Sequence, residues 1–384
     1  MKVICDRAAF SSALSDASGA VASRTPRPQL TCIKITASKD GADSQLTLTA
    51  TDAEVAIRLE SARVDVQRPG EALIPAEKLR QIVQAEDRDP TLTLEMDDTT
   101  CTITGEDSRF VLHGYDPKDF PPIPAVKEFT KTGVTTLSAG TLATMISQTI
   151  FATARENSRY AVNGVLMKRE ARKLVMAATD GRRLAISQSS VKGDAPTGPN
   201  SCIVPTKALG MLQKLLRDDE EPVSIGVTST QVLFAVGGHE EPRATLTSIL
   251  VEGTFPPYED VVPKDHDKKI VLDRELLASA VKRAALLTNE DSRGVRMAFV
   301  GKESKAEFTS RAPEMGEARV NVPLNSYSGE DLEVGFNPSY LTDAIKVISD
   351  AEVQLELKNE KQAGILRPKT NNDFVYVVMP VSLT

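Results

Sequence analysis

Residues 6–17 read DRAAFSSALSDA, residues 138–149 read SAGTLATMISQT, and residues 273–284 read DRELLASAVKRA. In each stretch, apolar or small side chains recur at positions i, i+3, i+4 and i+7, which places them on one face of an α-helix. Each stretch starts with a residue of the N-cap type, Asp6, Ser138 or Asp273. The starts are 132 and 135 residues apart. The sequence therefore predicts one helix that is used three times.

Two further landmarks recur with nearly the same period. A strand-like segment runs into a proline and then into an apolar helical segment at Pro75, Pro205 and Pro338, with offsets of 130 and 133 residues. Proline suits the first turn of a helix because its φ is fixed and it lacks an N–H. The triplet Phe-Pro-Pro at 120–122 returns at 255–257, each time before an extended linker. Three landmarks with one period predict three tandem copies of one domain, at 1–127, 128–262 and 263–384.

Between the helices, short segments alternate apolar and polar residues with a period of two, as at 46–50, 92–96, 223–227 and 353–357. This period is typical of strands with one buried face, and polar turn formers bound the segments. Each copy is therefore predicted to be an α+β domain with two helices and roughly eight strands in antiparallel sheets.

The composition narrows the class of protein. The chain has 384 residues, of which 41% are hydrophobic, and no apolar run is long enough to span a bilayer. The start of the chain has no leader pattern, so we expect a cytoplasmic protein without a membrane partner. Four widely spaced cysteines at 5, 32, 101 and 202 are expected to be buried thiols. The net charge of −7 leaves nucleic-acid binding open, because a ring can carry acid outside and base inside.

The sequence lacks the usual motifs of an enzyme. Its three histidines, His113, His239 and His266, are far apart, and it has no GxxxxGK[ST] or GxGxxG motif. The acidic clusters at 95–98 and 218–221 are typical of solvated turns. A Thr179-Asp180-Gly181 loop has a counterpart in Thr51-Asp52, which indicates turn chemistry and not a catalytic site. We therefore predict no catalysis, no cofactor and no metal.

Several local stretches in their order resemble one family: RYAVNG at 159–164, ATDGRRLA at 178–185, FPPY at 255–258, GFNPSY at 335–340 and YVVMPVSL at 376–383. Together with the triplicated frame, they resemble the bacterial replicative sliding clamp, the DNA polymerase III beta subunit, over the full length. The resemblance implies a head-to-tail homodimer whose six domains form a closed ring lined by helices. It implies a non-catalytic processivity factor in DNA replication, within a DNA-directed DNA polymerase holoenzyme of the nucleotidyltransferase class of transferases.

The implied partners are double-stranded DNA, the polymerase III catalytic subunit, the clamp loader and other proteins with a clamp-binding motif. A clamp must slide, so DNA contacts should be diffuse positive charges near phosphates and not base-specific bonds. The candidate DNA-binding residues lie on or after the helices: Arg24, Arg27, Lys78, Arg159, Tyr160 and Lys207. Arg24, Arg159 and Tyr160 resemble positions that the family uses, whereas Glu77, Glu156 and Ala161 depart from the family pattern.

By the same resemblance, partners insert a short hydrophobic peptide into a groove between the second and third domains. Such a groove needs apolar walls and a few polar groups that orient the peptide. The matching positions are Val162, Thr179, Gly181, Arg182, Arg183, Leu184, Pro256, Val261, Asn337, Tyr340, Val377, Val378, Met379, Pro380 and Val381. Plain core packing is the alternative for Leu184 and Val378. Ser382 departs from the basic residue that many relatives carry.

An alternative function keeps the fold but not the DNA: a clamp-like interaction scaffold that recruits partners. The two hypotheses differ in whether basic residues converge on the hole of the ring. In the clamp hypothesis, ring opening needs a separate ATP-driven loader, because the chain has no nucleotide-binding motif. The sequence leaves the affinity of the dimer, the opening mechanism and the preferred partner motifs open.

Overall fold

The computed structural model describes residues 1–40, 43–61, 64–131, 133–154, 162–192, 198–288 and 294–382, without the side chains at 43, 61 and 302. It divides into two compact units. Unit 1 comprises residues 1–143 and 191–250, and unit 2 comprises residues 144–190 and 251–384. Each unit therefore contains one complete predicted copy and part of the middle one.

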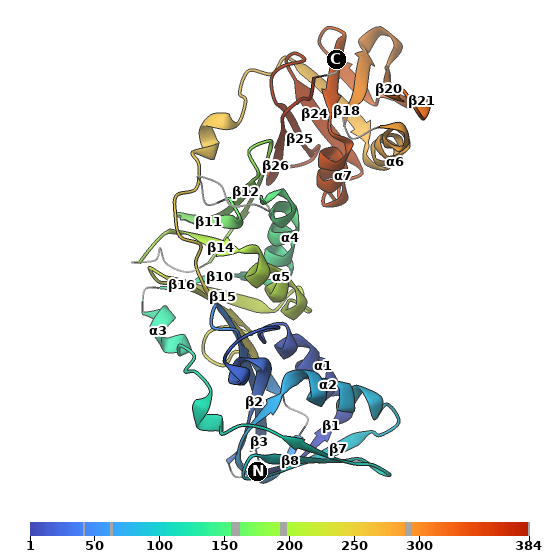
Figure 1. Ribbon diagram of the computed structural model, residues 1–384. Coiled ribbons are helices and arrows are strands. Elements are labelled where there is room, and N and C mark those ends of the chain that lie inside the picture. Colours follow the sequence, from blue (N-terminus) through green and yellow to red (C-terminus); the bar gives the residue numbers. More distant parts are fainter. Residues whose placement is uncertain are drawn as a thin grey trace. The chain divides into compact units, whose positions relative to one another are not determined.

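The three predicted copies share one order of elements, except that among the described residues the second has four strands between its two helices where the others have five (Figure 1). The first copy consists of β1 (Lys2–Asp6), α1 (Arg7–Ser18), β2 (Cys32–Asp40), β3 (Asp43–Thr51), β4 (Val55–Ser61), β5 (Val64–Arg68), β6 (Gly70–Pro75), α2 (Ala76–Ala85), β7 (Thr91–Asp97), β8 (Thr100–Thr104) and β9 (Arg109–His113). A short helix, α3 (Val126–Thr130), follows in the linker.

The second copy consists of β10 (Thr135–Ser138), α4 (Ala139–Thr149), β11 (Gly164–Glu170), β12 (Lys173–Thr179), β13 (Arg183–Ser190), β14 (Ser201–Pro205), α5 (Thr206–Leu215), β15 (Pro222–Val227), β16 (Gln231–Val236) and β17 (Ala244–Ile249). The third consists of β18 (Lys268–Asp273), α6 (Arg274–Ala284), β19 (Val295–Val300), β20 (Lys305–Ala312), β21 (Gly316–Pro323), β22 (Ser326–Ser328), β23 (Leu332–Phe336), α7 (Pro338–Lys346), β24 (Glu352–Leu357), β25 (Gly364–Pro368) and β26 (Phe374–Val378).

The predicted helix starts are confirmed. Asp6 accepts a hydrogen bond from the Ala9 N–H, Asp273 accepts one from the Leu276 N–H, and Ser138 accepts one from the Thr141 N–H. The apolar faces of the repeated helices are buried, as predicted. The prolines differ slightly from the prediction: Pro75 and Pro205 are N-cap residues, and only Pro338 is inside its helix.

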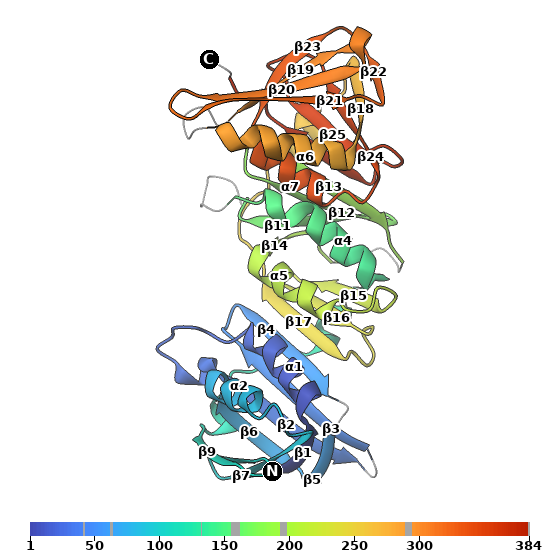
Figure 2. The same cartoon turned by 90° about the vertical axis from the view of Figure 1, so that its right-hand side faces the viewer.

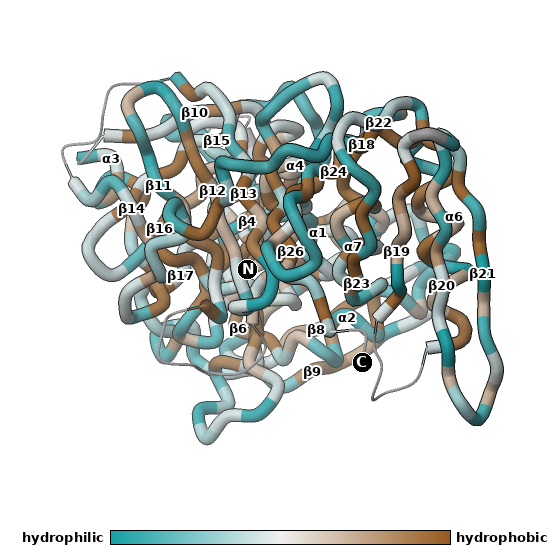
Figure 3. The backbone as a smooth tube through the Cα atoms, turned by 90° about the horizontal axis from the view of Figure 1, so that it is seen from above, coloured by the Kyte–Doolittle hydropathy of each residue, from teal (hydrophilic) through white to brown (hydrophobic). Residues whose placement is uncertain are grey.

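Antiparallel sheets carry the helices in both units. Unit 1 has one sheet in the order β10-β15-β16-β17-β4-β3-β2-β6 and another in the order β5-β1-β7-β8-β9. Unit 2 has the strands β11-β12-β13-β26-β25-β24-β18-β22 in one sheet and β21-β20-β19-β23 in another. Helices α1 and α2 lie side by side in unit 1, as do α6 and α7 in unit 2 (Figure 2). Hydrophobic segments follow the strands, and the connecting turns are largely hydrophilic (Figure 3).

Two strand pairs join one copy to the next. In unit 1, β4 of the first copy pairs with β17 of the second, with Val55 opposite Ser248. In unit 2, β13 of the second copy pairs with β26 of the third, with Arg183 opposite Val378. By element order, β4 corresponds to β13, and β17 corresponds to β26. The same edge-to-edge junction therefore occurs twice in the chain.

The structure confirms the predicted state of the cysteines: all four are buried free thiols. Burial raises the pKa of Cys5, Cys101 and Cys202 to about 12 and that of Cys32 to about 11. Within the described ranges, no three His, Cys, Asp or Glu side chains are grouped to hold a metal ion. No helix within those ranges is long and apolar enough to cross a membrane.

Candidate partner groove and DNA-facing residues

The Thr-Asp-Gly loop at 179–181 is a tight turn between β12 and β13. The Thr179 hydroxyl donates to the Arg183 carbonyl at 2.6 Å and accepts from the Gly181 N–H at 3.0 Å. Asp180 Oδ1 accepts from the N–H groups of Arg182 and Arg183. Gly181 has a φ of +85°, a conformation that glycine adopts without strain. The loop is therefore turn chemistry, as predicted.

This turn orients Arg183, which is the best-connected side chain of the predicted groove. Its Nε donates to Asp180 Oδ2 at 3.0 Å, its Nη1 to Asp343 Oδ2 at 2.8 Å, and its Nη2 to the Phe151 carbonyl at 2.8 Å. The guanidinium carbon also lies 4.5 Å from the centre of the Tyr340 ring. Burial alone would lower the pKa of Arg183, but the hydrogen bond to Asp343 and the neighbouring charges raise it. Arg183 thus stays charged and fixed by three elements.

Aromatic side chains close the site behind Arg183. Tyr376 on β26 is fully buried, donates to the Tyr340 carbonyl at 2.9 Å, and lies 5.8 Å from the Phe151 ring, centre to centre. Burial raises the pKa of Tyr376, so its hydroxyl remains a neutral donor. The arginine and these rings hold η3 (Ile150–Ala152), β13, α7 and β26 in one arrangement. Such a preorganised frame is what a peptide-binding groove requires.

The structure divides the predicted groove residues into a covered set and an accessible set. Leu184 lies opposite Val377 in the β13–β26 pair, and only 4% of Leu184 is exposed. The buried members are Val162, Thr179, Leu184, Val377 and Val378. Arg183 is only slightly exposed, with 10% of its side chain accessible. The exposed or partly exposed members are Gly181, Arg182, Pro256, Val261, Asn337, Tyr340, Met379, Pro380 and Val381. Core packing was the alternative interpretation of Leu184 and Val378, and the burial of both residues agrees with it.

The accessible set contains two large exposed apolar side chains. Met379 is 42% exposed and Val261 is 54% exposed. Backbone hydrogen bonds position the segment that carries Met379: the Met379 N–H donates to the Arg182 carbonyl at 3.0 Å, and the Val381 N–H donates to the Gly335 carbonyl at 2.8 Å. Asn337 has a structural role as well, because its side-chain oxygen accepts from the Ser339 N–H and caps α7.

Four supporting residues were absent from the predicted set: Phe151, Asp180, Asp343 and Tyr376. Asp180 had a signal in the sequence, because it stands in the quoted motif beside Arg183. Asp343 had none, since an acidic residue on a helix is usually solvated. Phe151 contributes a backbone carbonyl, which any residue type supplies.

The predicted DNA-binding residues have different surroundings. Arg24, Arg27 and Lys78 are exposed in unit 1, where α1 contacts both α2 and α5. Lys78 donates to Gln81 at 3.1 Å, and Lys207 is ion-paired with Asp52. Arg159 and Tyr160 lie outside the described residues, as do Glu156 and Ala161. Glu77, the remaining departure, accepts a hydrogen bond from Gln81.

Comparisons with known proteins cover the whole chain. The N-terminal, central and C-terminal domain models of the DNA polymerase III beta subunit match residues 1–124, 136–257 and 259–382. The beta sliding clamp of Pseudomonas putida is 34% identical over 339 residues, which are 88% of this chain and 89% of the relative. That of Escherichia coli is 31% identical over 342 residues, or 89% and 90% of the two chains.

Solved structures agree. A sliding clamp of Pseudomonas aeruginosa bound to griselimycin has a TM-score of 0.90 at 31% identity, and a polymerase sliding clamp of Bacillus subtilis has 0.90 at 27%. Each comparison covers 100% of both chains. The chain belongs to the DNA polymerase III beta subunit family, and it is a DNA sliding clamp, a non-catalytic processivity factor of DNA replication.

Proposed function

We propose that the chain acts as a head-to-tail homodimer that encircles double-stranded DNA in the cytoplasm. Its groove in unit 2 binds the polymerase III catalytic subunit, the clamp loader and other proteins with a clamp-binding motif. The observation that carries the partner assignment is the fixed Arg183 frame together with the exposed side chain of Met379, whose N–H donates to the Arg182 carbonyl. Apolar side chains held beside oriented polar groups are typical of peptide recognition.

We assign the domain boundaries to 1–127, 128–262 and 263–384. The matched family ranges, 1–124, 136–257 and 259–382, support the first boundary. They put the second between residues 257 and 259, a few residues before the proposed one. Both positions precede β18, the first strand of the third copy, which begins at Lys268.

The ring follows from the two repeated junctions. By element order, β9 corresponds to β17 and β26, and β21 corresponds to β4 and β13. Within the described residues, β9 pairs only with β8, and β21 pairs only with β20, so each has a free edge. Pairing β21 of one protomer with β9 of its partner would use the same junction a third time. Two such contacts close a ring of six domains.

Exposed apolar side chains support a contact at these edges. Leu286 is 72% exposed on η5 (Ala285–Leu287), which contacts β21. Val111, on β9, is also among the exposed large hydrophobic residues. Free strand edges with apolar neighbours are usually covered by a partner.

For DNA, we propose direct but weak contacts through Arg24, Arg27 and Lys78, and through Arg159 and Tyr160 by resemblance. The first three are exposed, and Arg24 and Arg27 have no ion-pair partner in the described part of the chain. Lys207 is a weaker candidate, because Asp52 already neutralises its charge. Contacts of this kind neutralise phosphates without reading sequence, so they should weaken steeply with salt.

Retention on circular and on linear DNA tests whether the protein encircles the duplex. The protein is loaded by the cognate loader onto nicked circular plasmid, half of the sample is linearised, and both halves are gel-filtered in high salt. We expect the protein to stay on circles and to leave linear DNA through its ends. Equal loss from both forms would refute encirclement and would favour the clamp-like scaffold that does not act on DNA.

A C-terminal truncation tests the groove. Deleting residues 377–384 would remove Val377 and Val378, which pair with β13 and are buried, so it would damage the fold. Deleting residues 379–384 removes the exposed methionine and spares the strand pair. We expect this shorter truncation to abolish polymerase stimulation while the dimer remains intact by light scattering. Full stimulation by the truncated protein would refute the groove.

A further inference from the structure

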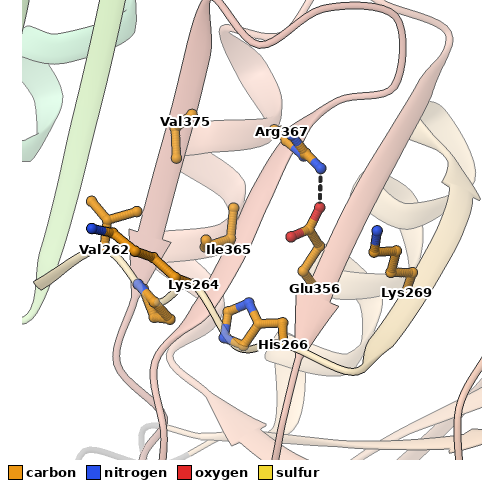
Figure 4. A pocket seen from close by; sticks show the side chains of 9 residues that line it. Val262, Lys264, His266, Lys269, Glu356, Ile365, Arg367 and Val375 are labelled. Carbon is orange, nitrogen blue, oxygen red and sulfur yellow. Dashed lines mark hydrogen bonds and ion pairs between the residues drawn. The ribbon is translucent and has the colours of Figure 1, made fainter.

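A cavity of about 410 Å³ lies beside the proposed groove in unit 2 (Figure 4). Val262, Pro263 and Lys264 line it from the linker before β18, and Ile365 and Val375 line it from the sheet. Its volume is within the range of small-ligand pockets. One wall is apolar, whereas the remaining lining residues are polar or charged.

The charged lining is mostly cationic. Lys264, Lys269 and Arg367 face a single lining carboxylate, Glu356. That carboxylate is already bound by Arg367 (Figure 4) and by Gln354. Lys264 and Lys269 are exposed, and neither has an ion-pair partner among the residues that the structure describes. In a chain of net charge −7, two free lysines beside a neutralised carboxylate form a local site for an anion.

Basic and acidic residues alternate along the linker, and only the basic ones line the cavity. Lys264 and His266 line the cavity, whereas Asp265 and Asp267 between and after them do not. Each of these two aspartates pairs with a lysine outside the cavity lining. An extended chain points successive side chains in opposite directions. The linker thus presents its basic groups to the cavity and keeps its carboxylates away from it.

His266 leaves one buried polar atom for an occupant. Its Nε2 is hydrogen-bonded to the Ala363 carbonyl at 2.9 Å, so Nε2 carries the proton. Its Nδ1 is buried and has no hydrogen-bond partner in the described structure. Buried polar atoms are rarely left without a partner. Nδ1 is then an acceptor, so a donor such as a backbone N–H of a bound segment would satisfy it.

The register of the sheet connects the cavity to Leu184 and Val377, two buried residues of the predicted groove. Leu184 is opposite Val377, Val377 opposite Ile365, Ile365 opposite Glu356, and Glu356 opposite Lys269. Directly opposite residues share one face of a sheet, so these five form a single row across five strands. Three strand spacings of about 4.8 Å separate Val377 from Lys269, roughly 14 Å, which an extended segment of about four residues spans.

We propose that the cavity is an acidic-flank subsite of the partner groove. It takes the carboxylate of an Asp, a Glu or a chain terminus, placed about four residues from the apolar anchor of a partner segment. Lys264 and Lys269 pair with this carboxylate, and the apolar wall takes the aliphatic part of the segment. The inference rests on the proposed partner groove and adds to it a charge preference in the flank of the partner.

Fluorescence anisotropy with labelled peptides tests the subsite. Each peptide carries the hydrophobic clamp-binding segment of the cognate polymerase, a four-residue spacer and either Glu-Glu or Gln-Gln, with the pair before or after the anchor. We expect Glu-Glu in one of the two orientations to bind about three- to tenfold more tightly than Gln-Gln at low salt. The advantage should vanish in high salt.

Matched lysine variants locate the effect. The Lys264→Gln, Lys269→Gln double variant should lose the advantage of Glu-Glu and keep its affinity for Gln-Gln. A control with Lys173→Gln and Lys282→Gln removes two exposed lysines elsewhere in unit 2 and should keep the advantage. Failure of the Gln-Gln peptides to bind at all would overturn the groove. Normal Gln-Gln binding without an acidic advantage, or an advantage that survives the double variant, would overturn the subsite alone.

Discussion

The turn at 51–55 and the turn at 179–183 have the same backbone but use their aspartates differently. In both, the threonine hydroxyl bridges the turn, and one aspartate oxygen accepts two backbone N–H groups. In both, the end of the partner strand, β17 or β26, adds one more bond: Ile249 N–H to the Glu54 carbonyl at 2.9 Å and Met379 N–H to the Arg182 carbonyl at 3.0 Å. One local design therefore makes both junctions between copies.

The second aspartate oxygen distinguishes the two junctions. Asp52 pairs with Lys207 on α5, an exposed lysine that links the first two copies. Asp180 instead orients Arg183, which then reaches Asp343 on α7. A lysine adds one flexible point charge, whereas an arginine fork fixes several groups at once. The first junction thus has a structural ion pair, and the second has a rigid frame beside exposed apolar side chains.

The largest expected effect comes from the proposed third junction, between protomers. Leu286→Asp places a charge on the apolar surface beside β21, so we expect a monomer where the wild type is a dimer. Size-exclusion chromatography with light scattering measures the change. Leu276→Asp alters a different exposed leucine, which lies in α6. This variant is the matched control and should remain dimeric. A dimer that survives Leu286→Asp would show that η5 is not part of the third junction.

The second-largest effect is expected from the Arg183 frame at the second junction. Arg183→Ala leaves Asp180 and Asp343 without their partner and should cost about 3 kcal/mol of stability. Binding of the polymerase peptide should fall at least tenfold, because Tyr340 loses its support. Arg172→Ala, at an exposed position in the turn between β11 and β12 and outside the predicted groove, is the control for both thermal unfolding and peptide titration. Equal effects of the two variants would refute the special role of Arg183.

These two junctions also show what sequence reasoning reaches. The landmarks that reveal the repeat, the helix starts and the Thr-Asp turns each depend on neighbours within a few residues, and all were predicted. The pairing of β13 with β26 and the contact of Arg183 with Asp343 join residues that are far apart in the chain. No local pattern encodes such partners, so Asp343 and Phe151 were missed. Lys207 was predicted to face DNA from its charge and its place on a helix. Its ion pair with Asp52 joins residues that are far apart in the chain, so no local pattern indicated it.

A smaller effect is expected at the first junction. Burial alone would raise the pKa of Asp52, but hydrogen bonds from Lys207 and two backbone N–H groups hold it below its usual value. A lowered pKa stabilises the fold above the unfolded pKa, near 4, and this contribution is lost as pH falls through the folded value. Asp52→Asn should therefore cost about 0.5–1 kcal/mol at pH 7, and the difference should shrink below about pH 4.

Urea unfolding across this pH range measures the effect of Asp52→Asn. Lys207→Gln removes the other partner of the ion pair, and the double variant should add little to either single change. A cost that stays constant from pH 7 to pH 3 would mean that the charge of Asp52 is not what stabilises the junction.

The smallest effect on folding stability is expected at Ile249, the last residue of β17, and at Met379, directly after β26, which are both 42% exposed. Only Met379 lies beside the Arg183 frame. Met379→Ser should therefore weaken binding of the polymerase peptide by about five- to tenfold, because it removes an apolar side chain that the bound peptide would cover. Ile249→Ser should leave peptide affinity unchanged, and neither variant should shift thermal unfolding appreciably, since both side chains are exposed. Equal weakening by Ile249→Ser would mean that the first junction also binds peptide, so that the arginine frame is not what makes a junction into a partner site.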